Sequence, residues 1–267
     1  MSFQKYSYYA ASIPKLLLGM KPWTRVLQVF LGRIGSGDHL IQLKKSGLRF
    51  HTRGKMDIWS VKETFLDRFY ERFGTPIEDG WTVIDIGGGI GDFTIFAALG
   101  FPNNSVYAFE PTPGSFELLQ KNLRLNGLAR VQAFPEAIWA ENGTLAMDTT
   151  TGEPGQFTSH AGTSSADPTK VTVPSISLEE VFNRLELTGC DLLKIDCEGA
   201  EYAILFYTPD VVLNKIQRIV LEYHDGVTEF NHQDLANFLS QHGFKVETFA
   251  NFVHRDLGYL RALREDS

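Results

Sequence analysis

Cysteine is scarce in this 267-residue sequence, in which only Cys190 and Cys197 occur. Their spacing does not match the paired ligands of a zinc site, and two cysteines are too few for the disulfide framework of a secreted domain. We therefore predict a chain without disulfides that works in the reducing cytoplasm.

Long apolar runs are also missing, because no stretch approaches the roughly 20 residues that a membrane-spanning helix requires. The apolar residues 16–18 follow Pro14 and Lys15 directly and are too few for a signal peptide. We predict no membrane span and no export. The amphipathic spacing of residues 26–31 favours packing onto the chain's own domain over contact with a membrane or a partner.

Positive charge is in deficit, since 25 Lys and Arg stand against 32 Asp and Glu, for a formal net charge of -7. General binding to nucleic acid relies on clustered Lys and Arg, so this class of function is disfavoured. With 43% hydrophobic and 21% charged residues, the composition is typical of a globular protein. The length fits one α/β domain with an appendage better than two full domains.

Residues 1–80 lack an alternation of strands and turns and show helical spacing, most clearly at Trp59, Phe65 and Phe69. From Trp81 onward, short β-branched runs alternate with amphipathic segments, as in a parallel sheet covered by helices. We therefore predict a mainly helical N-terminal segment, residues 1–80, and a Rossmann-like domain, residues 81–267.

The strands of this domain are expected at residues 81–86, 105–109, 130–134, 191–196, 216–223, 244–249 and 258–263, with a short strand near residue 171. Helices are expected from residue 92, over 113–126, from 177 and from 233. Ser177 with Glu180 three residues later predicts a capping box. Residues 143–147 resemble a small hairpin, and residues 152–169, rich in Gly, Ser, Thr and Pro, predict a loop.

The first strand runs into a turn that contains Gly87, Gly88, Gly89 and Gly91, and a helix then begins at Asp92. Glycine lets a ligand approach the backbone closely, and a helix N-terminus offers free amides in the same space. In a doubly wound sheet this crevice is the ligand site, so we predict cofactor binding rather than an empty tight turn. A dinucleotide fingerprint needs its third glycine at position 92, so the spacing weakens an NAD interpretation.

Asp85 lies inside the first strand, two residues before the first glycine. A buried carboxylate without partners is costly. We therefore predict that Asp85 orients the loop or meets a positively charged ligand group, such as an amino-acid ammonium.

The second strand ends in Phe109, Glu110 and Pro111. We predict that Glu110 accepts hydrogen bonds from a ribose diol while Phe109 or Pro111 packs beside it, although such an acid also suits NAD. After the third strand, Glu136 and Ala137 lie where backbone and apolar contacts would hold an adenine ring.

Five segments together closely resemble the FkbM family of S-adenosylmethionine-dependent methyltransferases, namely residues 83–92, 109–111, 175–178, 193–201 and 220–224. The similarity covers most of residues 50–250. Its most specific element is D-x-E-G-x-E, here residues 196–201, in which Cys197 stands where the family commonly has Val or Ile.

The resemblance implies an α/β class I methyltransferase fold, with a mostly parallel seven-stranded sheet, helices on both faces and an antiparallel last strand, preceded by the N-terminal helical segment. It implies S-adenosylmethionine as the cofactor and S-adenosylhomocysteine as the product. It also implies transfer to a hydroxyl of a small-molecule or carbohydrate-type acceptor. Neither the acceptor nor the oligomeric state follows from it.

Methyl transfer from a sulfonium requires an aligned acceptor and removal of its proton. Asp196 ends the fourth strand, and Glu222 and His224 end the fifth, at the sheet edge where the cofactor is expected. We predict that Asp196 and His224 act jointly as base and orienting group, with Glu222 beside them. Alternatively, Asp196 caps the next helix and His224 bonds the sheet edge, or these residues and Glu198 bind a divalent cation, although we predict no metal.

Related sequences have an Arg and an Asp before the sheet. By this resemblance we expect Arg53 and Asp57, together with His51 and Trp59, to fold over the cofactor. The alternative is that these four are ordinary surface residues. Residues 162–165 are expected either over the acceptor or in a mobile linker.

Three other functions compete: an NAD-dependent oxidoreductase, a noncatalytic cofactor-binding partner protein, and an RNA methyltransferase, which the acidic net charge disfavours.

Overall fold

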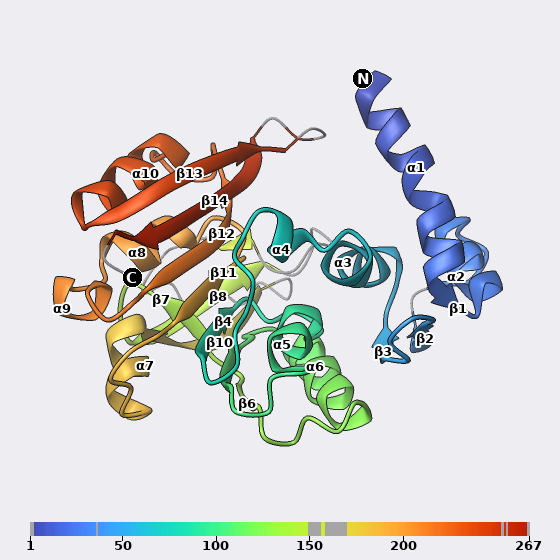
Figure 1. The fold of residues 1–267 in the computed structure, drawn as a ribbon, viewed down its shortest axis with the longest axis horizontal. Helices are drawn as coiled ribbons and strands as arrows, with labels where there is room; N and C mark the ends of the chain where they lie inside the picture. Colours follow the sequence, from blue (N-terminus) through green and yellow to red (C-terminus); the bar gives the residue numbers. More distant parts are fainter. Residues whose placement is uncertain are drawn as a thin grey trace.

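The computed structural model describes residues 3–35, 37–148, 156–157, 170–251, 254 and 256–265. Its centre is a seven-stranded sheet in the order β13-β14-β12-β11-β4-β5-β6 (Figure 1). The strands are β4 (Thr82–Ile86), β5 (Ser105–Phe109), β6 (Gln132–Phe134), β11 (Leu192–Ile195), β12 (Arg218–His224), β13 (Phe244–Ala250) and β14 (Leu257–Arg264). Neighbours pair in parallel except where β14 pairs with β12 and β13. This topology confirms the predicted Rossmann-like class I fold with an antiparallel last strand.

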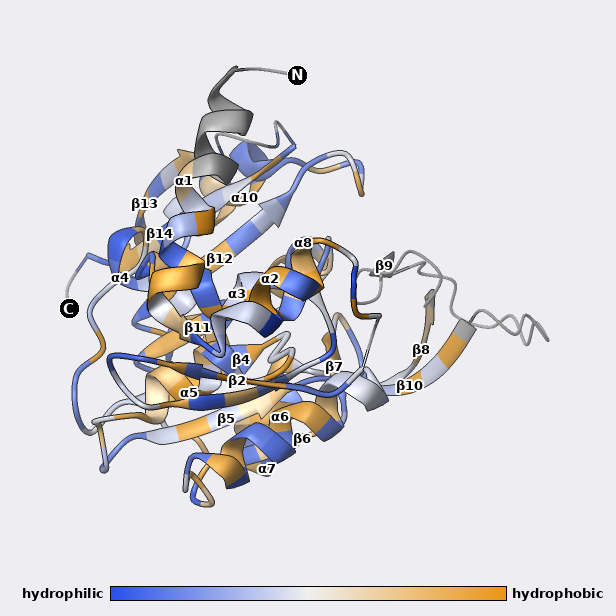
Figure 2. Ribbon diagram, turned by 90° about the vertical axis from the view of Figure 1, so that its right-hand side faces the viewer, coloured by the Kyte–Doolittle hydropathy of each residue, from blue (hydrophilic) through white to orange (hydrophobic). Residues whose placement is uncertain are grey.

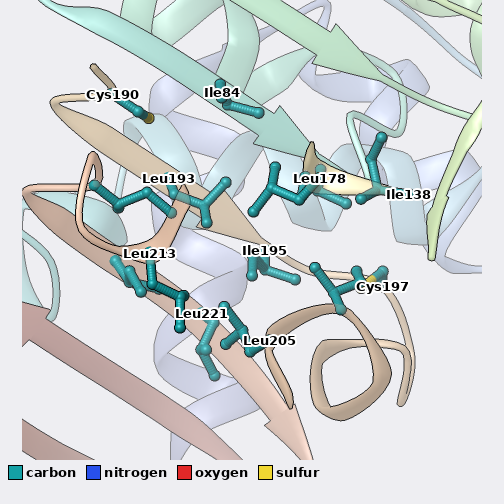
Figure 3. Close-up of a cluster of buried hydrophobic side chains, with 14 of the residues drawn as sticks. Ile84, Ile138, Leu178, Cys190, Leu193, Ile195, Cys197, Leu205, Leu213 and Leu221 are labelled. Atoms are coloured by element: carbon teal, nitrogen blue, oxygen red, sulfur yellow. The ribbon is translucent and has the colours of Figure 1, made fainter. Parts of the chain in front are cut away.

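Helices cover both faces of this sheet, namely α5 (Asp92–Ala98) and α6 (Pro113–Leu125) on one face and α7 (Leu178–Arg184), α8 (Glu201–Phe206), α9 (Asp210–Leu213) and α10 (His232–Gln241) on the other. Successive side chains of a strand point to opposite faces, so Val83 packs with α5 and α6 whereas Ile84 packs with the second set. Figure 3 shows this second face, where Ile84 and Leu193 of the strands meet Leu205 and Leu213 of α8 and α9. Hydrophobic and hydrophilic residues interleave along α6 and α7 (Figure 2), as expected for helices with one buried side.

The described residues of the N-terminal segment form four helices and three strands: α1 (Phe3–Gly19), β1 (Met20–Lys21), α2 (Trp23–Phe30), β2 (His39–Leu43), β3 (Arg49–Thr52), α3 (Lys55–Phe65) and α4 (Phe69–Arg72). In Figure 1, α1, α2 and the three strands lie together at one side of the molecule, with α3 between them and the main sheet. Its mainly helical character was predicted, but its three strands were not. The antiparallel sheet β1-β2-β3 was missed because β2 and β3 are short and gain support from α6, where Asn122 and Asn126 accept hydrogen bonds from the β3 backbone.

The N-terminal segment shares a hydrophobic core with the sheet rather than forming its own. Phe50 of β3 and Ile58 of α3 are fully buried in the same cluster as Trp81 and Val83. The secondary structure changes near the boundary predicted at residue 80, but the residues on the two sides of this boundary pack into one hydrophobic core.

A second, smaller sheet has the strand order β7-β10-β8-β9 and consists of β7 (Ala137–Trp139), β8 (Gly143–Asp148), β9 (Gln156–Phe157) and β10 (Lys170–Ser177). Residues 143–147, predicted as a small hairpin, instead form one strand, β8, which pairs antiparallel with β10, the strand predicted near residue 171. Ser177 caps α7 by accepting from the Glu180 N–H at 3.1 Å, but its own N–H donates to Asn142, so half of the predicted capping box forms. Apart from β9, the predicted loop 152–169 lies outside the described residues. No helix in the described part of the chain is long and apolar enough to cross a membrane.

Candidate functional site

A cavity of about 990 Å³ opens where β4, β5, β11 and β12 end at their carboxyl termini. Parallel strands bring these ends to one edge, which is the ligand site of open α/β sheets. Nine of the residues predicted for the site line it: Gly87, Gly89, Phe109, Glu110, Pro111, Ala137, Asp196, Glu222 and His224. The predicted residues Asp85, Gly88, Gly91 and Glu136 do not line it.

The glycine turn needs its glycines for two different reasons. Gly87 has φ 74°, and a Cβ on it would lie 1.8 Å from the carbonyl oxygen of Asp196, so no larger residue fits between these two strands. Gly89 has φ 52°, and a Cβ there would meet no atom within 4 Å. Because Gly89 also lines the cavity, the turn leaves its backbone open to a ligand at this point.

The Glu110 carboxylate is held over the glycine turn at the end of β5. Its Oε2 accepts the Gly89 N–H at 2.8 Å, and its Oε1 accepts the Thr112 N–H at 2.8 Å. Burial raises the pKa of Glu110, whereas the two backbone hydrogen bonds oppose this rise. A carboxylate offers about four lone-pair sites. Glu110 can therefore still accept hydrogen bonds from a ligand hydroxyl pair in the cavity.

Asp85 lies beneath the glycine turn and pairs with Lys194 of the neighbouring strand β11. The register sets Lys194 opposite Asp85, and Lys194 Nζ lies 2.9 Å from Asp85 Oδ1 and donates to the Gly87 carbonyl at 2.8 Å. Thr94 Oγ1 donates to the other Asp85 oxygen at 2.5 Å. Burial alone lowers the pKa of Lys194, but Asp85 and Asp196 raise it overall, so the ammonium stays protonated. Of the two roles expected for Asp85, this geometry matches the orientation of the loop.

Glu136 and Ala137 were both predicted to contact the adenine ring, but their side chains lie in different places. Ala137 is buried and lines the cavity. Glu136 points to α7, where both its carboxylate oxygens accept from Arg184, at 2.9 and 2.7 Å. Only Ala137 is therefore placed to contact a ligand.

His224 sits between two acidic side chains of the D-x-E-G-x-E segment. Its Nδ1 lies 3.2 Å from Glu201 Oε1, and its Nε2 lies 3.3 Å from Glu198 Oε2. Burial alone would lower the pKa of His224, but the hydrogen bond to Glu201 and the charges of Glu201, Glu198 and Asp196 raise it to about 9. At neutral pH the ring is therefore an imidazolium, which cannot accept a proton from an acceptor hydroxyl.

This charge state predicts a pH-dependent stability. Because the folded pKa of His224 lies above its ordinary value of 6.5, the stabilisation is complete below about pH 6.5 and disappears as the pH rises towards 9. We expect wild type to lose about 3 kcal/mol relative to His224→Gln over this range, measured by urea unfolding at several pH values. A constant difference between the two proteins across the range would contradict the assigned charge.

Glu222 lies near His224 on the cavity wall, and its environment disfavours the charged form of its side chain. Burial raises the pKa of Glu222 well above its usual range, and the charge of Asp196 adds to the rise while His224 opposes it. Tyr259 of β14 donates its hydroxyl to Glu222 Oε1 at 3.3 Å. A carboxylate with a raised pKa is a stronger base than an exposed one, so Glu222 in its ionised form suits proton removal.

The N-terminal segment supplies another wall of the cavity. The Arg53 guanidinium donates two hydrogen bonds to Asp57, both 3.0 Å long, and the Arg53 backbone N–H donates a third at 2.6 Å. The Nη1 of Arg53 also donates to Ser115 of α6 at 3.0 Å. Arg53, Asp57 and Trp59 line the cavity, whereas His51 pairs with Asp38 away from it. Three of the four residues expected over the cofactor thus border its predicted space.

Several residues on the cavity wall were not predicted, among them Glu63, Tyr70, Lys194 and Tyr259. One signal could have identified Lys194, because a Lys inside the apolar strand Leu192–Ile195 must be buried and paired. Tyr70 and Tyr259 carry no such signal, since α4 and β14 bring them to the site from distant parts of the chain.

Carboxylates dominate the polar part of the cavity wall. The lining includes nine Asp and Glu residues and three Lys and Arg residues: Asp57, Glu63, Asp92, Glu110, Asp196, Glu198, Glu222, Asp225 and Asp256 against Arg53, Lys55 and Lys194. Within the described ranges, no group of three or more His, Cys, Asp or Glu side chains is arranged to hold a metal ion. The charge balance favours a ligand that carries positive charge.

The two cysteines are free and buried. Burial raises the pKa of Cys190 to about 12 and that of Cys197, which lines the cavity, well above its ordinary value. The reactive form of cysteine is the thiolate, so neither side chain is primed as a nucleophile.

Comparison with known proteins identifies a family. Residues 85–246 match the model of the methyltransferase FkbM domain. The chain is 30% identical over 205 residues to Methyltransferase 1 of Beauveria bassiana, an alignment that covers 69% of this chain and 80% of the relative. It is 27% identical over 215 residues to the 31-O-demethyl-FK506 methyltransferase FkbM of Streptomyces tacrolimicus, with the same shares covered. Hexuronic acid methyltransferase AglP of Haloferax volcanii is 23% identical over 220 residues, covering 82% of this chain and 85% of the relative.

Solved structures show more distant similarity. Methyltransferase FkbM from Methylobacillus flagellatus aligns with a TM-score of 0.49 and 14% identity over 77% of this chain and 53% of that chain. A putative methyltransferase from Streptococcus mutans, solved in complex with SAH, aligns with a TM-score of 0.48 and 12% identity over 74% of this chain and 96% of that one.

Proposed function

The chain belongs to the FkbM methyltransferase family, and on that premise we propose that it transfers a methyl group from S-adenosylmethionine to a hydroxyl oxygen of a small-molecule or carbohydrate-type acceptor. The proposal depends on one observation. The glycine turn, Glu110, Asp196 and Glu222 all line the same cavity, so a cofactor and an acceptor could lie in it side by side. The family match removes the oxidoreductase alternative. The cytoplasmic location stays a prediction.

The cofactor fits the groups that are present. Glu110 has free acceptor sites for the ribose hydroxyls, and the backbone at Gly89 is open for close approach. The sulfonium adds a positive charge that the product S-adenosylhomocysteine lacks, and the excess of carboxylates on the wall stabilises that charge. Bound there, the cofactor would supply an electrophilic methyl group.

The acceptor's proton must leave as its oxygen attacks. The bound cofactor would supply the methyl group to this oxygen and leave as S-adenosylhomocysteine, and the proton would pass to a carboxylate. We assign this proton to Glu222, with Asp196 orienting the hydroxyl. His224 keeps its proton and, as a cation, holds Glu198 and Glu201 in place. This revises the joint base of Asp196 and His224 expected from the sequence.

An oxygen acceptor is supported by the relatives. The name of one relative specifies a methyl group at an oxygen, 31-O, and the name of another specifies a hexuronic acid. Two alternatives remain, a noncatalytic role and an RNA methyltransferase. The first is excluded once purified protein forms S-adenosylhomocysteine with any hydroxyl acceptor, and the second, which the net charge of -7 already disfavours, would require turnover with RNA instead.

The Glu110 assignment predicts the effect of removing its carboxylate. Glu110→Ala should weaken binding of S-adenosylhomocysteine about 10- to 100-fold, because charge-assisted hydrogen bonds to the ribose are lost, as measured by calorimetric titration. Glu136→Ala is the matched control, since Glu136 was predicted for the same cofactor but faces Arg184 outside the cavity. Equal affinity of the Glu110 variant and wild type would refute the ribose contact.

A further inference from the structure

The cavity continues beyond the strand ends to the helices α1 and α2. Ile13 and Leu17 of α1, Leu27 and Phe30 of α2, and Leu31 directly after it all line this part. Every lining residue between positions 13 and 31 is apolar, whereas the nine lining carboxylates come from residue 57 onward. The cavity therefore has an acidic part at the sheet and an apolar part at the helices.

The apolar part is open rather than filled by the protein's own core. Ile13 and Leu31 are 50% and 54% exposed, and Leu17, Leu27 and Phe30 are half-buried. Leu16 and Val26, on the same two helices, are buried and anchor them to the core. Leu16 and Val26 also border the cavity, so the wall at these helices combines buried core residues with exposed and half-buried apolar ones.

Resting on the proposed function, we propose that the acceptor is an amphiphile, whose uncharged hydroxyl-bearing head lies at Asp196 and Glu222 and whose alkyl body lies against α1 and α2. The apolar wall is continuous with the methyl-transfer site, so one molecule can occupy both parts. The volume of about 990 Å³ is at the upper end of the range of about 300–1,000 Å³ for ligand cavities, which leaves room for an acceptor beside the cofactor. An anionic head would be repelled by the carboxylates on the wall.

To test this, the protein is first saturated with S-adenosylhomocysteine. Hexyl, heptyl and octyl β-glucoside are then titrated into it by calorimetry, each below its critical micelle concentration. Affinity should rise about two- to four-fold for each added methylene, the gain expected from its burial. Octyl β-glucuronide, with the same chain but a carboxylate on the head, should bind at least ten-fold more weakly than octyl β-glucoside. Chain-length-independent binding, or equal binding of the glucuronide, would overturn the proposal.

Two double variants locate the effect. Ile13→Asn with Leu31→Asn changes two exposed residues that line the cavity and should abolish the dependence on chain length. Leu18→Asn with Trp23→Asn changes residues that are 75% and 51% exposed on the same helices but do not line the cavity, and should preserve it. If instead the second pair alone abolishes binding to phosphatidylcholine vesicles and chain length has no effect, the helices face a membrane and the proposal fails.

Titration with S-adenosylhomocysteine alone distinguishes a failure of the proposed function from a failure of the amphiphilic-acceptor proposal. If wild type does not bind this molecule, the proposed function fails, whatever the glucosides do. If wild type binds it and both double variants bind it equally well, a flat response to chain length overturns the amphiphilic acceptor alone.

Discussion

Glu222→Gln should lower kcat for methyl transfer by about 10²- to 10⁴-fold while leaving the affinity for S-adenosylhomocysteine within two-fold of wild type. The amide keeps the size of the side chain and can still accept from the Tyr259 hydroxyl, but it cannot take the acceptor's proton. The measurement is the rate of S-adenosylhomocysteine formation, with the hydroxyl compound that wild type methylates fastest among polyols, sugars and alkyl glucosides.

Two comparisons make this result specific. Glu229→Gln, at an exposed carboxylate that does not line the cavity, should leave kcat unchanged. The rate of wild type should fall as the pH drops through the raised pKa of Glu222, and this limb should disappear in Glu222→Gln. If Glu222→Gln retains the wild-type rate while Asp196→Asn loses it, the base is Asp196 instead.

Lys194→Met should destabilise the protein by about 3–5 kcal/mol, since it leaves the Asp85 carboxylate buried without its cation. This is a large share of a typical domain stability of about 5–15 kcal/mol. The same change frees the Gly87 carbonyl, so the glycine turn should bind S-adenosylhomocysteine more weakly. Urea unfolding followed by circular dichroism measures the first effect, and calorimetry measures the second.

The control for this prediction is Lys245→Met, at an exposed position of β13, which should change stability by less than about 0.5 kcal/mol. The double variant Lys194→Met with Asp85→Asn should recover part of the lost stability, because it removes the unpaired charge. Equal stability of Lys194→Met and Lys245→Met would show that the pair does not hold the turn.

Patterns local in the sequence predicted the central elements well. β5 was expected at the residues where it occurs, and the helix after Thr112 ends within a residue of the expected position. β4 and β11 were each placed to within one residue at both ends. β4 and β11 are short, mostly apolar runs buried on both faces, and α6 has helical spacing, so each pattern lies within one segment of the sequence.

The same reasoning failed where a partner decides the structure. β2 and β3 form against each other and against Asn122 and Asn126 of α6, more than 70 residues along the chain. Glu136 was assigned to adenine because of its place after a strand, but Arg184 of α7 takes its carboxylate. No local pattern contains the position of such distant partners.

The sequence by itself determined the Rossmann-like sheet, the glycine turn, the acid after β5 and the family, because each resides in a short run of neighbouring residues. Only the tertiary structure decided which charges those residues carry and what they face. His224 is an imidazolium because Glu198 and Glu201 flank it, and Asp85 holds the turn because register brings Lys194 beside it. A charge depends on burial and on neighbours in space, so it becomes defined when the strands and helices pack.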